Sequence, residues 1–255
     1  MRENPGRLTR AAAVLAGSCA VFATLAAAPA SASTPVAPLA PGAQPSIIGG
    51  STAQNPGYIT RFNGHANGYT FFCTSTLIGA RWVLTAKHCM YDNNGQRLSD
   101  IDLYVGSNSA SGGVHAKAAA TYLYSGGDLA LIKLNTNGGS TFARLASSSS
   151  DAEEGDAARV YGWGATQSTD EGSHQSNVLK QASVQISDTT ASDYFGGPAI
   201  EADTPNGAVA GGDSGGPMLD GGVQVGVCST SDRSSTTTYG SVAAGRSWIR
   251  QTSGV

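Results

Sequence analysis

The order of a few residues along this chain constrains its fold more strongly than its composition does. Residues 211–217 read Gly-Gly-Asp-Ser-Gly-Gly-Pro, so Ser214 lies between glycines that let a carbonyl group approach the backbone closely. A serine becomes a strong nucleophile only beside a base, and a third group must orient that base. All 4 histidines of the chain, at positions 65, 88, 115 and 174, precede this serine. A fold that uses Ser214 as a nucleophile must therefore bring an earlier histidine to it.

The base and the orienting acid each have a candidate beside a strand-like apolar run. His88 follows such a run at 82–86 and is adjacent to Cys89, at a polar corner. Asp128 opens the run 128–134 directly after two glycines, which places it at the mouth of a strand, where a rigid scaffold meets a loop. The three candidates therefore occur in the order His, Asp, Ser.

This order excludes two folds that use the same chemistry. Residues 212–216 fit the G-x-S-x-G pattern of an α/β-hydrolase, but that fold places its acid and its histidine after the serine. A subtilisin-type order needs an aspartate before the histidine, and no aspartate precedes Asp92. The order His, Asp, Ser is therefore the remaining arrangement for a catalytic serine in this chain.

Six motifs in sequence order resemble the chymotrypsin/trypsin-like serine protease family, most closely its secreted bacterial members. They are IIGG at 47–50, TAKHC at 85–89, DLALIKL at 128–134, GWG at 162–164, GDSGGP at 212–217 and SWI at 247–249. The resemblance covers the chain from Ile47 to its C-terminus. It implies a secreted serine endopeptidase with His88, Asp128 and Ser214 as catalytic residues.

The apolar runs predict an all-β fold, because they are short and separated by Gly, Asn, Asp and Ser turns. The resemblance implies two six-stranded antiparallel β-barrels with the active site in the cleft between them, followed by a short C-terminal helix. We expect the first barrel at about 47–150, the second at about 151–243 and the helix at about 244–255. The apolar runs that predict strands are 82–84, 101–105, 129–134, 159–161, 178–186 and 223–227.

The N-terminal region predicts export. Three arginines precede an apolar stretch from Ala11 to about Leu25, and Ala30-Ser31-Ala32 fits a signal-peptidase site. The alternative, a membrane anchor, is disfavoured because the run is short and no stop-transfer charges follow it. We therefore expect a signal peptide at 1–32, a Pro- and Ala-rich pro-segment at 33–46 and the protease domain at 47–255.

Export permits disulfides, and the family pairs cysteines at the positions of Cys73 and Cys89. Cys228 then has no partner in the mature chain. A buried apolar cysteine on the strand at 223–227 is favoured over an intermolecular disulfide.

The resemblance also implies an oxyanion hole and an activation step. The backbone N–H groups of Gly212 and Ser214 would bind the oxyanion. In the family, a new N-terminal amine pairs with the aspartate before the nucleophile, here Ile47 with Asp213. The residues before that cut are Pro45-Ser46 rather than Arg or Lys, so we expect cleavage by another secreted protease or by the enzyme itself, not by a trypsin.

The expected specificity pocket carries no charge. The family places the carboxylate that selects Arg or Lys six residues before the nucleophile, and this chain has Ala208 there. Thr237 replaces a common glycine and should narrow the pocket. We therefore expect a preference for small or medium apolar side chains before the scissile bond. The remaining pocket walls are expected from Val209, Ser229, Thr230 and Ser231, the last three also pairing with substrate as an added strand.

The expected partners are protein or peptide substrates and a protein inhibitor, with a monomeric chain and no membrane contact after signal removal. The net charge of -3 offers no basic surface for nucleic acid. No cofactor is expected, and no H-E-x-x-H or paired-cysteine pattern predicts a metal site, although loop carboxylates leave a calcium site open. Two alternatives remain: a catalytically silent binding protein with the protease fold, and an esterase that uses the same triad.

Overall fold

The computed structural model describes residues 47–147, 149–205 and 207–255. The predicted signal peptide and pro-segment lie outside the described residues. The described elements are fourteen strands, one α-helix and three short 3-10 helices. Over these residues, no helix is both long enough and apolar enough to cross a membrane.

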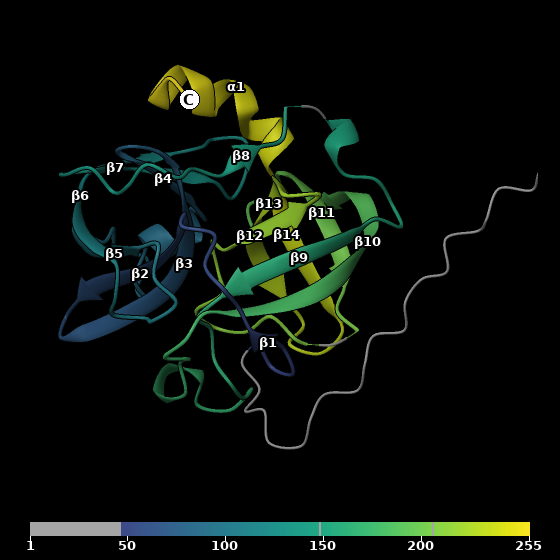
Figure 1. Ribbon diagram of the computed structural model, residues 1–255, viewed down its shortest axis with the longest axis horizontal. Helices are drawn as coiled ribbons and strands as arrows, with labels where there is room; N and C mark the ends of the chain where they lie inside the picture. The colour runs from purple at the N-terminus through teal and green to yellow at the C-terminus, as the bar shows by residue number, and fades with distance from the viewer. Residues whose placement is uncertain (1–46, 148, 206) are drawn as a thin grey trace, which may run out of the picture. The chain divides into compact units, whose positions relative to one another are not determined.

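Six antiparallel strands close the first barrel in the order β2-β3-β4-β7-β6-β5 (Figure 1). Strand β5 illustrates how the barrel core is filled: Ile101, Leu103 and Val105 are buried, and the residues between them point away from the core. Asn67 and Gly68 make the two-residue turn between β2 and β3 with φ of 52° and 80°, a left-handed conformation that this residue pair favours. The strands are β2 (Ile59–Ala66), β3 (Tyr69–Gly79), β4 (Trp82–Thr85), β5 (Asp100–Val105), β6 (Val114–Leu123) and β7 (Ala130–Leu134).

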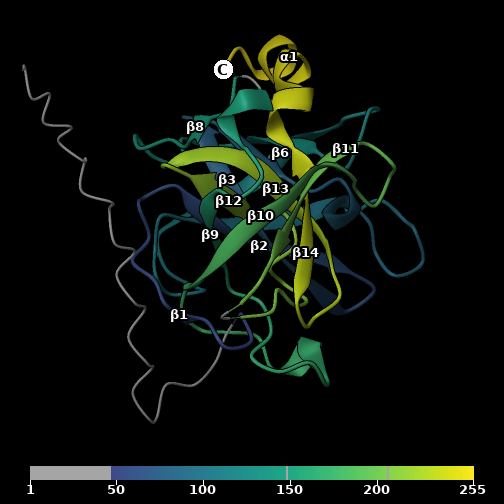
Figure 2. The same cartoon turned by 90° about the vertical axis from the view of Figure 1, so that its right-hand side faces the viewer.

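The second barrel also closes six antiparallel strands, in the order β10-β11-β14-β13-β12-β9, with β9 pairing back to β10 (Figure 2). Two short strands extend this sheet: β1 pairs with β10, and β8 pairs in parallel with β13. The expected all-β fold with two six-stranded barrels is thus confirmed. The strands are β1 (Ser51–Thr52), β8 (Arg144–Leu145), β9 (Ala157–Gly162), β10 (Lys180–Ser192), β11 (Pro198–Asp203), β12 (Pro217–Asp220), β13 (Val223–Ser231) and β14 (Thr236–Ser241).

The C-terminal helix α1 (Val242–Ser253) packs on β8 and β13 (Figure 1). It begins two residues before its expected start because Ser241 caps it: the Ser241 side chain accepts a hydrogen bond from the Ala244 amide. Gly254 ends it in the left-handed conformation at φ 78°. The 3-10 helices are η1 (His88–Met90), η2 (Ser149–Asp151) and η3 (Glu171–Ser173).

One hydrophobic core runs through both barrels. Leu77 and Leu103 of the first barrel belong to the same buried cluster as Val160 and Val227 of the second. Backbone hydrogen bonds also cross the junction, where the Thr74 amide donates to the Ser214 carbonyl at 2.8 Å. The segment that carries Ser214 is therefore fixed at the contact between the barrels.

Candidate active site

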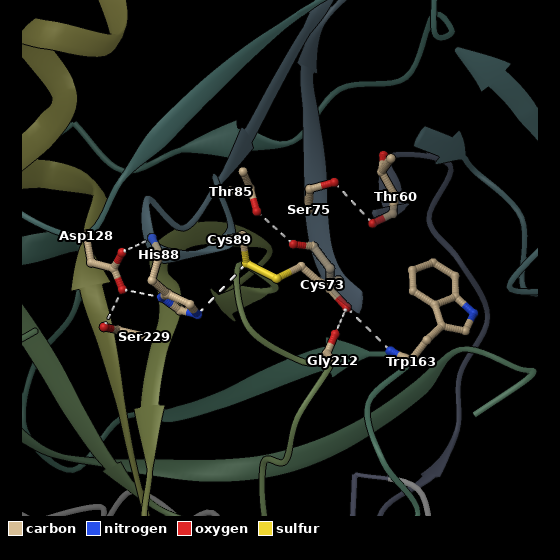
Figure 3. Close-up of a disulfide and its surroundings, with 11 residues drawn as sticks. Thr60, Cys73, Ser75, Thr85, His88, Cys89, Asp128, Trp163, Gly212 and Ser229 are labelled. Carbon is tan, nitrogen blue, oxygen red and sulfur yellow. Dashed lines mark hydrogen bonds and ion pairs between the residues drawn. A yellow bond between two sulfur atoms is a disulfide. The ribbon is translucent and has the colours of Figure 1, made fainter. Parts of the chain in front are cut away.

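His88 and Asp128 are brought together by the pairing of β4 with β7. Thr85 at the end of β4 is opposite Ala130 at the start of β7, so the residues just beyond both strand ends are neighbours. The His88 amide donates to Asp128 Oδ1 at 2.9 Å, and His88 Nδ1 lies 2.7 Å from Asp128 Oδ2 (Figure 3). Because a carboxylate only accepts, this geometry assigns the Nδ1 proton to the histidine and leaves Nε2 as the basic nitrogen.

The corner that carries His88 is held by a disulfide. Cys73 on β3 and Cys89 in η1 are bonded, as expected from the resemblance. Figure 3 shows the His88 ring between Asp128 and this disulfide, with Nε2 3.9 Å from Cys89 Sγ. The bond thus fixes the turn that presents the imidazole.

Asp128 is fully buried and is stabilised by polar partners. Ser229 Oγ donates to Asp128 Oδ2 at 2.6 Å, beside the two contacts from His88. The Asp128 amide donates to a second carboxylate, Asp193 Oδ2, at 2.6 Å. A buried carboxylate needs such donors, because desolvation without compensation is costly. Ser229 therefore orients the acid with its side chain, in addition to lining the cleft.

Ser214 and His88 line the same cleft, whose volume is about 860 Å³. No hydrogen bond joins Ser214 Oγ to His88 Nε2 in this state. In unliganded hydrolases such contacts are often long and tighten when substrate binds. The structure thus brings the two residues to one cleft without the nucleophile–base contact.

The loop around the serine requires glycine at a specific position. Gly215 has φ of 80°, and a Cβ there would overlap Thr85 Oγ1 and the Thr74 carbonyl oxygen. Its amide donates to the Cys228 carbonyl at 2.8 Å. The loop is therefore packed tightly between β3, β4 and β13.

Two backbone amides at this loop have no hydrogen-bond partner among the residues that the structure describes. Across the described residues, the amides of Gly212 and Ser214 donate no hydrogen bond. Gly212 is buried, and its carbonyl accepts from Thr74 Oγ1 at 2.9 Å. Unpaired buried N–H groups are rare in proteins, so the Gly212 amide is a candidate donor to a ligand, and the amide of the half-buried Ser214 offers a second.

Asp213 is buried and lies against a glycine-lined wall. Its oxygens accept from the Gly164 amide at 2.7 Å and the Ala210 amide at 3.1 Å. A side chain at Gly162 or Gly164 would overlap the carboxyl group. Burial raises the pKa of Asp213 to about 7, although the two backbone hydrogen bonds and the Arg61 guanidinium oppose the shift.

The start of the described chain lies close to this loop. Ile48 and Ala208 exchange backbone hydrogen bonds of 2.8 and 2.7 Å, and the Ile47 side chain is fully buried. The structure shows no hydrogen bond or ion pair between Ile47 and Asp213. The two proposed partners of the activation ion pair are therefore on neighbouring segments but are not joined.

The expected pocket residues divide into two groups. Val209, Ser229, Thr230 and Ser231 line the cleft. Ala208 and Thr237 are buried and are not among its lining residues, and Thr237 Oγ1 donates to the Thr230 carbonyl at 3.1 Å. Thr237 therefore contacts the back of the wall that Thr230 forms.

Sequence reasoning missed an aromatic loop at the cleft. Tyr194 and Phe195 are 66% and 42% exposed, and the Tyr194 ring meets the His88 ring edge-on at 6.1 Å. Lys87 Nζ lies 3.9 Å from the Phe195 ring centre. The signal was present in the sequence, as two aromatic residues directly before Gly196-Gly197 in an otherwise polar segment.

The cysteines near this site are either buried or joined in a disulfide. Cys228 is a buried free cysteine on β13, and burial raises the pKa of its thiol. Within the described ranges, the one group of metal-ligating side chains is Cys73, His88 and Cys89. Because the two sulfur atoms are bonded to each other, they offer no thiolate to an ion.

Comparison with known proteins identifies relatives over most of the chain. The family model described as Trypsin matches residues 47–249. Trypsin alpha of Drosophila erecta is 32% identical over 232 residues, covering 81% of this chain and 87% of that protein. Curated relatives include insect trypsins and a snake venom serine protease, so the expected placement among bacterial members is not supported.

Solved structures share the fold. A structure titled HL collagenase has a TM-score of 0.68 at 23% identity and covers 82% of this chain and 99% of its own. A scabies mite inactivated protease paralogue, S-D1, has a TM-score of 0.68 at 21% identity and covers 80% and 96%. At these identities the likeness concerns the fold, and the inactivated paralogue shows that proteins with this fold include inactive ones.

Proposed function

The chain belongs to the trypsin family of serine proteases, and on that premise we propose that it is a serine endopeptidase with His88, Asp128 and Ser214 as its catalytic residues. The observation that carries the proposal is the 2.7 Å contact between His88 Nδ1 and the fully buried Asp128, beside a cleft that Ser214 also lines. Proteases of this family act on protein or peptide substrates.

The proposed reaction begins when Ser214 Oγ attacks the carbonyl carbon of the scissile bond and His88 Nε2 takes the hydroxyl proton. Asp128 stabilises the imidazolium and fixes its tautomer. His88 then gives this proton to the amine nitrogen as the C–N bond breaks, which leaves an acyl group on Ser214. A water molecule, deprotonated by His88, then attacks the acyl carbon. The bond from this carbon to Ser214 Oγ breaks as His88 returns the proton to Oγ, which releases the acid and restores the serine.

We assign the oxyanion hole to the amides of Gly212 and Ser214. Both are without a protein partner across the described residues, which supports this role. In a comparable hydrolase, loss of one such donor costs about 3 to 4 kcal/mol of transition-state stabilisation.

For specificity, we propose a preference for small or medium apolar side chains before the scissile bond. The support is that Val209 lines the cleft and that position 208 holds alanine, where a carboxylate would select Arg or Lys. Digestion of a peptide library tests this. A clear preference for Arg would contradict it.

For maturation, we propose secretion after removal of residues 1–32 and activation by a cut before Ile47, whose amine would pair with Asp213. Sequencing the N-terminus of the active secreted form should give Ile-Ile-Gly-Gly. An active but unprocessed chain would contradict this scheme.

An organophosphonate that labels activated serines tests the central proposal. Wild-type protein should be labelled at Ser214 and should cleave peptides, whereas Ser214→Ala should do neither while unfolding at the same denaturant concentration. Ser231→Ala, which alters another serine of the cleft, should still be labelled.

A catalytically silent binding protein is the second candidate, because an inactivated protease paralogue of the scabies mite shares this fold. Failure of labelling in the form cut before Ile47 would support it. Label and ester hydrolysis without peptide cleavage would instead support an esterase.

A further inference from the structure

Glu171, in the short helix η3, contacts two separate segments of the cleft wall. Its Oε2 accepts a hydrogen bond from the Gly211 amide at 3.0 Å. Its Oε1 accepts from Arg233 Nε at 2.6 Å, and Oε2 also lies 3.3 Å from Arg233 Nη2. One carboxylate thus links the loop that carries Ser214 to the loop between β13 and β14. We call Glu171, Gly211 and Arg233 the 171 clamp.

At the nucleophile loop, the clamp holds the residue directly before the proposed oxyanion donor Gly212. The Gly211 carbonyl accepts from Gln175 Nε2 at 2.7 Å and from the Ala165 amide at 2.8 Å. Hydrogen bonds therefore hold both the amide and the carbonyl of Gly211. A Cβ at position 211 would overlap Glu171 Oε2, so any residue other than glycine would push the carboxylate away from the Gly211 amide.

At its other end, the clamp reaches the backbone expected to pair with substrate. Arg233 Nη1 donates to the Ser231 carbonyl at 3.3 Å, and the Arg233 amide donates to Ser231 Oγ at 2.9 Å. Arg233 itself lines the cleft and has φ of 59°, in the left-handed region. Its side chain therefore lies over the end of β13 while its guanidinium faces Glu171.

A solvent-exposed ion pair would not by itself justify a functional role. The side chains of Arg233 and Glu171 are 48% and 20% exposed, and such pairs change a folding equilibrium by about fivefold or less. A change of about 1 Å in the position of a catalytic group can lower a rate by about 100-fold. If the clamp sets the position of the oxyanion donors, its loss must therefore affect turnover far more than stability.

We propose that Glu171 is a positioning residue, which holds residues 211–214 in register with the substrate-pairing end of β13. The effect on turnover rests on the proposed endopeptidase function. The effect on the conformation of residues 211–214 does not.

Kinetics of the form cut before Ile47 test the first effect. Glu171→Ala removes both contacts and should lower kcat by about 10- to 100-fold with KM changed less than about threefold, because the donors act in the transition state. Glu171→Gln keeps an acceptor for the Gly211 amide and should recover part of this loss. Arg233→Gln should affect mainly substrates long enough to pair with Ser231.

The matched control is Asp100→Asn, which breaks the exposed 2.8 Å ion pair with Lys117 on the first barrel. It should leave kcat and KM unchanged. An equal fall in kcat for Asp100→Asn, or a fall in kcat for Glu171→Ala no larger than its change in the folding equilibrium, would overturn the positioning role.

Hydrogen exchange of the uncut protein tests the conformational effect without any activity. In Glu171→Ala, the amides of Ala210 and Asp213, which donate hydrogen bonds within the loop, should exchange at least about tenfold faster, and those of β2 and β5 should not. Unchanged exchange at Ala210 and Asp213 would overturn the proposal even in an active enzyme. Faster exchange in a chain that neither cleaves nor binds the phosphonate would support the clamp and reject the endopeptidase function.

Discussion

Asp213 is a buried acid directly before Ser214 in the sequence. Its carboxyl group is buried, and among the described residues no cation lies within ion-pair distance of it. Burial is the main cause of its raised pKa, at about 7. In the uncut chain, the ionised form is therefore disfavoured by folding.

We expect this shift to appear in the pH dependence of stability. A carboxyl whose pKa rises on folding stabilises the fold below its unfolded pKa of about 4, and that stability is lost as pH rises through about 7. The free energy of unfolding of the uncut chain should therefore fall from pH 4 to 7, relative to Asp213→Asn, by at most about 4 kcal/mol. Denaturant titrations across this range measure it.

Cleavage before Ile47 provides the control for that measurement. If the new amine reaches Asp213, the carboxylate gains a cationic partner, and the difference in slope between wild type and Asp213→Asn should shrink or reverse. The same slope before and after the cut would contradict the proposed ion pair.

Gly215 has a left-handed backbone conformation and no room for a side chain. Comparison with Gly68, which has the same φ but open space around it, separates the cost of backbone strain from the cost of steric overlap. Gly215 and Gly68 share φ of 80°, but a Cβ at Gly68 meets nothing within 4 Å. Gly68→Ala should cost about 1 kcal/mol of stability from backbone strain alone. Gly215→Ala should cost about 2 to 4 kcal/mol in total and abolish activity, because overlap with Thr85 is added. Equal losses from thermal unfolding of both variants would contradict this explanation.

At the scale of the elements, the disulfide has the most direct effect on the site. It joins β3 to η1 across a sequence separation of 16 residues, which corresponds to about 3 kcal/mol in the chain-entropy model. Replacing Cys73 and Cys89 together by alanine should lower the free energy of unfolding by about that amount. Peptidase activity should fall as well, because η1 carries His88.

Cys228→Ala is the matched control for this double variant. It removes a buried sulfur from β13 without breaking a covalent link, so it should cost about 1 to 2 kcal/mol through lost packing. Addition of a reducing agent should then lower the stability of Cys228→Ala and leave that of the double variant unchanged.

The elements could be predicted in part. Alternating apolar runs such as that of β5 predicted their strands, because the buried positions are hydrophobic. Strand β3 escaped prediction because Thr74, Ser75 and Thr76 are buried on it, and two of these hydroxyls have distant partners: Thr74 on Gly212 and Ser75 on Thr60. The 171 clamp could not be predicted either, because Glu171 is 40 residues before Gly211 and 62 before Arg233, and only the fold brings them together.

At the scale of the molecule, the shared core predicts that the two barrels unfold together. Buried residues of both belong to one cluster, and the Ser214 loop is bonded to β3 and β13. Variants that keep only Trp82, on the first barrel, or only Trp163, beside the second, should give coincident denaturation curves by fluorescence. Two separate midpoints would show that the barrels are independent folding units.

The pairing of β1 with β10 has a consequence for synthesis. Ser51 and Thr52 are opposite Gln181 and Lys180, so the strand nearest the start of the described chain finds its neighbour only after some 130 further residues have been translated. While the ribosome completes the first barrel, that strand has no native edge to join. Folding of the nascent protease can therefore finish only when its second half has emerged.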